Sequence, residues 1–260
     1  MNQLQRLLDQ RNRISHLIVI LNTDYVNKIK GRLVDAEDPY MRTKDDFLFR
    51  LRAIGFHLTG MVEYLDSIPQ RLDDLQYSSN STMMPTALFG KEFARNVLYL
   101  FENVLFNLAS LLDYTGYLAL RSIEVNDKKK WKGLESSCRD FNNPLSKLEL
   151  AGIVREFQNG FAANLFALRS EIIHDESLRP NVEIDWYVVE RKYEIDVKIP
   201  QNVINKFSRL KNSGDQTLTE FTFWIVGQTL DGVEKILINL QTDIEINRRI
   251  ALGNEVFVNR

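Results

Sequence analysis

Arg169 and His174 are of residue types that could together cleave a phosphodiester bond. They lie in the segment Leu-Arg-Ser-Glu-Ile-Ile-His-Asp, residues 168–175. Histidine titrates near neutral pH, so it can move a proton between a ribose 2′-hydroxyl, the scissile phosphate and the leaving oxygen. Arginine stays charged and can bind phosphate oxygens in a forked geometry. These two residues are our candidate catalytic pair, with Ser170 and Glu171 as candidate supporting residues.

The helical position of this pair predicts a subunit interface. At about 100° per residue, Arg169 and His174 lie about 140° apart around a helix, and Phe166, Ser170 and Ile173 project between them. Such a surface is too apolar for plain solvent and too polar for a core. Because an interface between two subunits would satisfy both kinds of side chain, we expect a homodimer.

The segment resembles the signature of the HEPN family of helical nucleases. In that signature four to six residues separate an arginine from a histidine, and the residue directly after the arginine is often polar. A long apolar segment precedes it and contains Asn-Leu-Ala-Ser-Leu-Leu-Asp-Tyr, residues 107–114. This order resembles the HEPN bundle over about residues 45–177. Ser170 departs from the family, where asparagine, aspartate or histidine is more usual. Asn107 and Asp113 become further candidate supporting residues.

The resemblance implies a metal-independent endoribonuclease that cleaves single-stranded RNA and leaves a cyclic phosphate. Its composite site would contain two copies of Arg169 and His174 at a dimer interface. The resemblance also implies a role in defence or stress response, with an antitoxin or an activating protein as a partner. The alternative is a catalytically inactive HEPN-like module that binds a protein or an RNA.

Purely structural roles remain open for the same residues. His174 near a helix C-terminus would interact favourably with the helix dipole. Arg169 would then simply pair with Glu171 or Asp175. Both interpretations predict the same helix without any catalysis.

The polar residues of the preceding segment and a metal site give two further interpretations. Glu102, Asn107 and Asp113 are also typical of core polar groups that fix the register of a helix. Glu171 and His174 have the Glu-x-x-His spacing of ferritin-like metal sites, to which Glu102 could add a ligand. The chain carries one such copy where those sites use two, so we expect no metal and no cofactor.

Two other arginine–histidine pairs have the same spacing. Arg11 precedes His16, and Arg52 precedes His57, each with four residues between. The first follows only ten residues, too few for preceding bundle helices, and the second lies in mid-helix without a helix stop. The position of the third pair at the end of a long helix selects Arg169 and His174.

Composition excludes several classes of function. With 33 basic and 35 acidic residues and a formal charge of -2, the chain would not bind nucleic acid through bulk positive charge.

The sequence also indicates where the protein is located. Its one cysteine, Cys138, cannot form an internal disulfide. The apolar stretch Leu17–Leu21 is too short for a signal peptide, so we expect a cytoplasmic protein. Polar residues interrupt Val97–Leu120, which argues against a membrane span. No Walker loop, dinucleotide fingerprint or nucleophile elbow is present.

Apolar residues at helical spacing predict an all-α protein. Long helices are expected from near Gln3, over Phe47–Ile68, over about Thr86–Ile123, over about Ser146–Glu176 and over about residues 217–250. We expect a charged loop over Asp35–Asp46 and a less regular segment ending at Pro144.

The period changes from 3.6 to two over about residues 182–199. Apolar residues there alternate with polar ones on both sides of a turn at Glu190–Lys192, which predicts a β-hairpin. The whole chain is expected to be one elaborated helical domain with this hairpin appended to the HEPN-like core.

Overall fold

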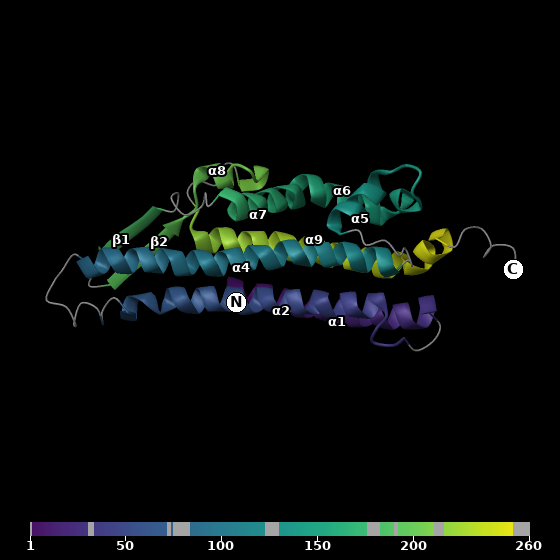
Figure 1. Cartoon of the computed structure of the whole chain (residues 1–260), viewed down its shortest axis with the longest axis horizontal. Coiled ribbons are helices and arrows are strands. Elements are labelled where there is room, and N and C mark those ends of the chain that lie inside the picture. The colour runs from purple at the N-terminus through teal and green to yellow at the C-terminus, as the bar shows by residue number, and fades with distance from the viewer. Residues whose placement is uncertain are drawn as a thin grey trace, which may run out of the picture. The chain divides into compact units, whose positions relative to one another are not determined.

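A computed structural model describes the backbone of residues 2–30, 34–71, 74, 84–122, 130–175, 183–189, 192–210 and 216–251. Within these ranges, the side chains of 28, 29, 84–91, 94, 144, 174, 175, 183–196 and 243–251 lie outside the description. The described chain is predominantly helical, which confirms the all-α class (Figure 1).

The first two long helices begin at residues whose side chains cap them. α1 spans Gln3–Asp24, and Asn2 before it accepts the Leu4 N–H at 3.1 Å. α1 continues into a π-helical turn, Tyr25–Lys30. α2 spans Pro39–Asp66, and Asp38 before it accepts the Tyr40 N–H at 2.8 Å. The expected loop over Asp35–Asp46 is therefore wrong from Pro39 onward, because proline suits a first helical position when the preceding residue caps it.

Two further long helices match the apolar stripes. α4 spans Met84–Ser122 and α9 spans Leu218–Ala251, each within two residues of the expected ends. Between them, α5 spans Trp131–Arg139, where a less regular segment was expected, and α8 spans Gln201–Ile204. The nine residues of α5 bury only three side chains, too few for the sequence pattern to stand out.

The helix expected over Ser146–Glu176 is not one continuous α-helix. It consists of a 3-10 turn Pro144–Lys147, α6 Glu149–Phe157, a π-helical segment Gln158–Ala162, and α7 Ala163–Asp175. The Trp131 indole N–H donates to the Gln158 side-chain oxygen at 2.6 Å within the π-helical segment. Wider turns of this kind occur mostly as short insertions in α-helices, often at functional positions.

Strands β1, Glu183–Val189, and β2, Lys192–Lys198, pair antiparallel. Trp186 pairs with Ile195, and Glu183 pairs with Lys198. Immediately after β2, the Ile199 N–H donates to the Gln216 carbonyl at 3.0 Å, which ties the end of the hairpin to the start of α9.

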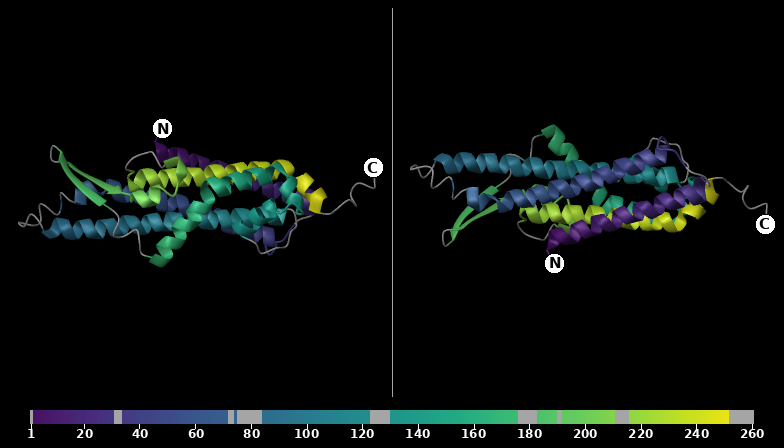
Figure 2. Two further views of the ribbon diagram at one scale, coloured as in Figure 1. Left: turned by 90° about the horizontal axis from the view of Figure 1, so that it is seen from above. Right: turned by 90° about the horizontal axis from the view of Figure 1, so that it is seen from below.

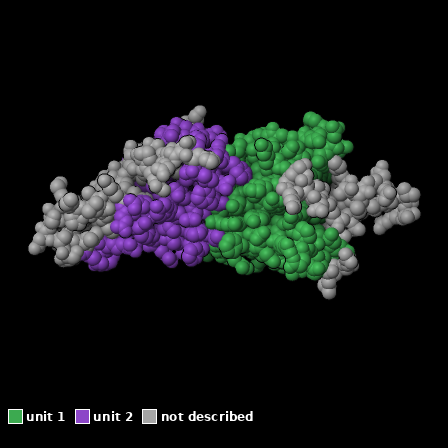
Figure 3. Space-filling model, viewed as in Figure 1, with its two compact units in different colours: residues 1–52, 107–163, 226–260 green, residues 53–106, 164–225 purple. Residues whose placement is uncertain are grey.

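The chain divides into two compact units (Figure 3). Unit 1 contains residues 1–52, 107–163 and 226–260, and unit 2 contains residues 53–106 and 164–225. The large side chains that are fully buried in unit 1 include Ile14, Ile18, Leu21, Tyr40, Phe47, Leu51 and Trp131. Those of unit 2 include Ile54, Phe93, Phe101, Phe207 and Phe221. Each such side chain contributes about 1.5–3 kcal/mol by its removal from water.

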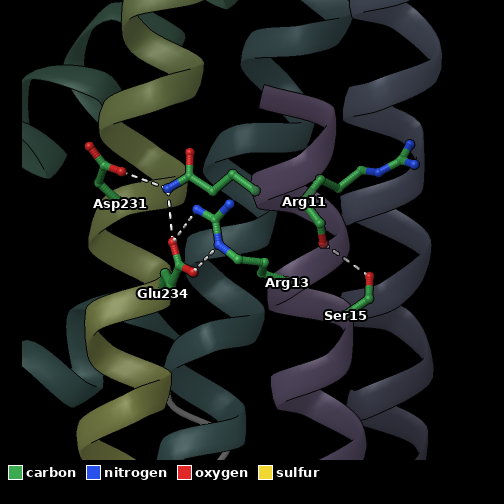
Figure 4. Close-up of polar contacts among 6 residues, drawn as sticks. Arg11, Arg13, Ser15, Asp231 and Glu234 are labelled. Atoms are coloured by element: carbon green, nitrogen blue, oxygen red, sulfur yellow. Dashed lines mark hydrogen bonds and ion pairs between the residues drawn. The ribbon is translucent and has the colours of Figure 1, made fainter. Parts of the chain in front are cut away.

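Within unit 1, α1 and α9 lie side by side (Figure 2) and share a polar contact (Figure 4). The Gln10 amide donates to Asp231 at 2.6 Å and to Glu234 at 3.0 Å. Arg13 donates to Glu234 at 3.0 Å. Gln10 is buried, so its hydrogen bonds fix the register between these two helices.

Candidate functional site

Arg169 lies in α7 and packs against α4 within unit 2. Its guanidinium carbon lies 5.8 Å from the centroid of the Phe106 ring, a cation–π contact. Its Nε is buried and has no hydrogen-bond partner in the described structure. A buried donor without an acceptor is unusual and costs about 1–3 kcal/mol. Arg169 is therefore fixed by an aromatic ring while one of its donors stays unsatisfied.

Glu171 pairs with a lysine that the sequence did not single out. Lys206 Nζ lies 2.7 Å from Glu171 Oε1, and both side chains are partly buried. Next to Lys206, the Phe207 ring lies 5.7 Å from Phe221 and 5.2 Å from Trp224, which holds this part of the chain in place. The described contact of Glu171 is therefore with Lys206 and not with Arg169. Asp175, the other residue with which Arg169 was expected to pair, has a side chain that lies outside the described set.

The rest of the signature lies along α7. Ser170 is exposed, Ile173 is 49% exposed and Phe166 is half-buried. The exposed Ile173 agrees with the mixed apolar and polar surface expected around the arginine. The backbone of His174 belongs to the last turn of α7, and its side chain lies outside the described set.

Asn107 and Asp113 lie in the part of α4 that belongs to unit 1, where each has a structural contact. Asn107 is buried and accepts a hydrogen bond from Arg50 at 3.2 Å. Asp113 accepts the backbone N–H of Trp131 at 3.3 Å, and Lys130 Nζ lies 3.7 Å from it. These contacts join α4 to α2 and α5, as the interpretation of core polar groups that fix helix register predicts.

The two alternative arginine–histidine pairs have different surroundings. The Ser15 hydroxyl donates to the Arg11 carbonyl (Figure 4). The Arg11 guanidinium donates to the neighbouring Asn12 at 3.0 Å, and His16 is exposed. Arg52 is exposed and belongs to unit 1.

His57, by contrast, is half-buried in unit 2, and its Nδ1 is buried without a hydrogen-bond partner in the described structure. Burial lowers the pKa of His57 below its ordinary value, which favours the neutral imidazole.

Sequence reasoning missed Phe106 and Lys206. Phe106 follows Leu105 within the apolar stripes of α4, so it could not be distinguished from core. Lys206 is one of many lysines, and only the placement of residues 201–210 beside α7 selects it.

Among the described side chains, no group of three or more His, Cys, Asp and Glu residues is placed to hold a metal ion. No helix in the described ranges is long and apolar enough to cross a bilayer. Scans of the chain against protein-family models, curated proteins and solved structures found no match.

Proposed function

We propose that this chain is a HEPN-like, metal-independent endoribonuclease that cleaves single-stranded RNA at Arg169 and His174. The proposal includes a composite site formed by two copies of the chain, a cytoplasmic location, and a role in defence or stress response under an antitoxin or an activating protein. The state of Arg169 is the observation that carries it.

Arg169 has the properties of an arginine that meets an anionic ligand. Its ring contact with Phe106 fixes the direction of the guanidinium, and its buried Nε still needs an acceptor. A phosphate oxygen would supply that acceptor through a charge-assisted hydrogen bond. The described contact of the Glu171 carboxylate is with Lys206 and not with this donor.

His174 would act as the proton-transfer group five residues along the same helix. An imidazole can both accept and donate a proton near neutral pH, which is what the two proton transfers of this cleavage require. A second copy of the chain would bring a second Arg169 and His174, so that one histidine can accept the 2′-hydroxyl proton while the other donates to the leaving oxygen.

The test compares the wild-type chain with Arg169→Ala and His174→Ala on end-labelled single-stranded RNA in excess chelator. Each variant is expected to lower the cleavage rate at least about 100-fold, the usual contribution of one acid–base or charge-stabilising group. His16→Ala and His57→Ala are matched controls, because each removes the histidine of an alternative pair. A rate that is unchanged in His174→Ala, or lost in either control, would contradict the assignment.

A catalytically inactive module that binds RNA or a protein is the second candidate. It is favoured by the packing of Arg169 against Phe106 of its own chain, which draws the guanidinium into the protein. This candidate predicts that no RNA is cut, while labelled RNA or an isolated partner still binds and Arg169→Ala weakens that binding. Fluorescence anisotropy on the same samples separates the two functions.

A further inference from the structure

Strand β1, Glu183–Val189, lies at an edge of its sheet (Figure 1). The described sheet has only the strands β1 and β2, so one edge of β1 has no neighbouring strand in the described part of the chain. The outer edge of β2 is different, because Lys198 bridges to Thr217 and the next N–H, that of Ile199, donates to Gln216. All of these residues belong to unit 2. A further strand that runs the full length of the sheet can therefore be added only beside β1.

The sequence of β1 lacks the residues that usually keep an open edge from pairing. Natural edge strands carry lysine, proline or a bulge for this purpose. β1, Glu-Ile-Asp-Trp-Tyr-Val-Val, contains no lysine and no proline, and its pairing with β2 is continuous from end to end. β2, Lys-Tyr-Glu-Ile-Asp-Val-Lys, has a lysine at each end. The composition of β1 is therefore typical of a strand that has neighbours on both edges.

The register of the hairpin determines which backbone groups of β1 face the open edge. Val189 pairs with Lys192, and only two residues separate them, so this pair exchanges backbone hydrogen bonds. Bonded pairs alternate along an antiparallel ladder, so the second, fourth and sixth residues of β1 direct their N–H and C=O away from β2. These residues are Ile184, Trp186 and Val188. The open edge therefore presents three donors and three acceptors in a row.

We propose that β1 pairs with β1 of a second copy of this chain, antiparallel about a twofold axis at Trp186, so that two hairpins form one four-stranded sheet. Ile184 then lies opposite Val188 of the other copy, and every outward N–H of both strands donates to a carbonyl across the axis. Within each hairpin, Ile184 pairs with Val197 and Trp186 pairs with Ile195, and Val197 is buried. The twofold axis keeps these apolar positions on one continuous face of the sheet.

The charges of β1 select this partner and this direction. Glu183 and Asp185 lie in the first half of the strand, and the residues from Trp186 to Val189 carry no charge. The antiparallel register places Glu183 opposite Val189 and Asp185 opposite Tyr187 of the other copy. A parallel arrangement would place each carboxylate opposite its own counterpart, and like charges in that position are destabilising. Self-pairing thus brings the charged half of each strand against the uncharged half of the other.

Cysteine cross-linking of the full chain under mild oxidation tests the register. Trp186→Cys places two thiols opposite each other across the axis, where the Cα atoms lie about 5.5 Å apart, and a disulfide is expected. Ile184→Cys is the matched control, because its two copies lie about 14 Å apart along the strands and cannot be bridged. A mixture of Ile184→Cys with Val188→Cys is expected to form a disulfide between the two variants. The native Cys138 adds little background, because it is buried and burial raises its pKa to about 12.

Sedimentation equilibrium of the 30.3 kDa chain tests the backbone pairing. Val188→Pro removes an outward N–H and leaves the ladder to β2 intact. By symmetry the dimer loses two hydrogen bonds, so association should weaken about 10- to 100-fold, whereas Val188→Thr keeps the N–H and should leave it unchanged. Association that is equal in these two variants, or a Trp186→Cys chain that forms no cross-link, would overturn the proposal. Neither measurement involves cleavage at Arg169 and His174, so a dimer joined only through α7 would lack the cross-link and leave the ribonuclease proposal standing.

Discussion

Gly116 is expected to tolerate no side chain, although alanine is the better helix former. A Cβ at this position of α4 would lie 2.8 Å from the Trp131 nitrogen and 2.9 Å from the Lys130 carbonyl carbon. Both are backbone atoms at the start of α5, and the Trp131 N–H is also held by Asp113. The obstacle therefore cannot rotate away as a flexible side chain would.

The magnitude follows from two opposing terms. Replacing glycine by alanine inside a helix stabilises the folded state by about 1 kcal/mol. Forcing α4 and α5 apart costs about 3 kcal/mol, the upper end for overpacking, because backbone must move. Gly116→Ala should therefore lower the free energy of unfolding by about 2 kcal/mol, or the Tm by about 4–8 °C for a chain of this size.

Gly152 in α6 is the matched control within the same unit. An added Cβ there meets nothing within 4 Å, so only the helix-propensity term remains. Gly152→Ala should raise the free energy of unfolding by about 0.5–1 kcal/mol. Differential scanning calorimetry of both variants and the wild type measures the two shifts with opposite signs. A Gly116→Ala variant as stable as the wild type would refute the close approach of α4 and α5.

Three further predictions concern polar groups. Gln10→Ala removes two hydrogen bonds to α9 and should lower the free energy of unfolding by about 1–2 kcal/mol in urea titration, whereas the exposed Gln5→Ala should change it by less than about 0.5 kcal/mol. Because burial lowers the pKa of His57, its contribution to stability is present above its ordinary pKa and is lost as the pH falls toward its folded value. Unfolding measured from pH 8 to pH 5 should therefore show a loss that His57→Gln abolishes, and an equal loss in that variant would contradict this source. Lys206→Met and Glu171→Gln should show a coupling energy of about 0.2–1 kcal/mol in a double-mutant cycle, with zero coupling as the contrary result, because both side chains are partly exposed.

The long helices could be predicted because their information is local. Buried residues such as Leu51, Ile54 and Leu58 recur at intervals of three and four, and they occupy the buried face of α2. Their periodicity exists in the sequence before any tertiary contact forms.

The errors occurred where a local signal was ambiguous or short. Pro39 was interpreted as a helix breaker, although with Asp38 before it a proline suits the first turn. The π-helical segment Gln158–Ala162 has the same apolar spacing as an α-helix, so the period did not reveal it. Within this π-helical segment, Gln158 accepts a hydrogen bond from the indole N–H of Trp131, which lies 27 residues away in the chain.

The candidate site divides in the same way between sequence and structure. The spacing of Arg169 and His174 on one helix followed from the sequence alone, because a helix fixes the angle between residues that are close in the chain. The ring that lies against Arg169, and the lysine that binds Glu171 from 35 residues away, were decided only by tertiary packing. Helical periodicity specifies which face of a helix is apolar, and the neighbouring elements determine which side chain meets that face.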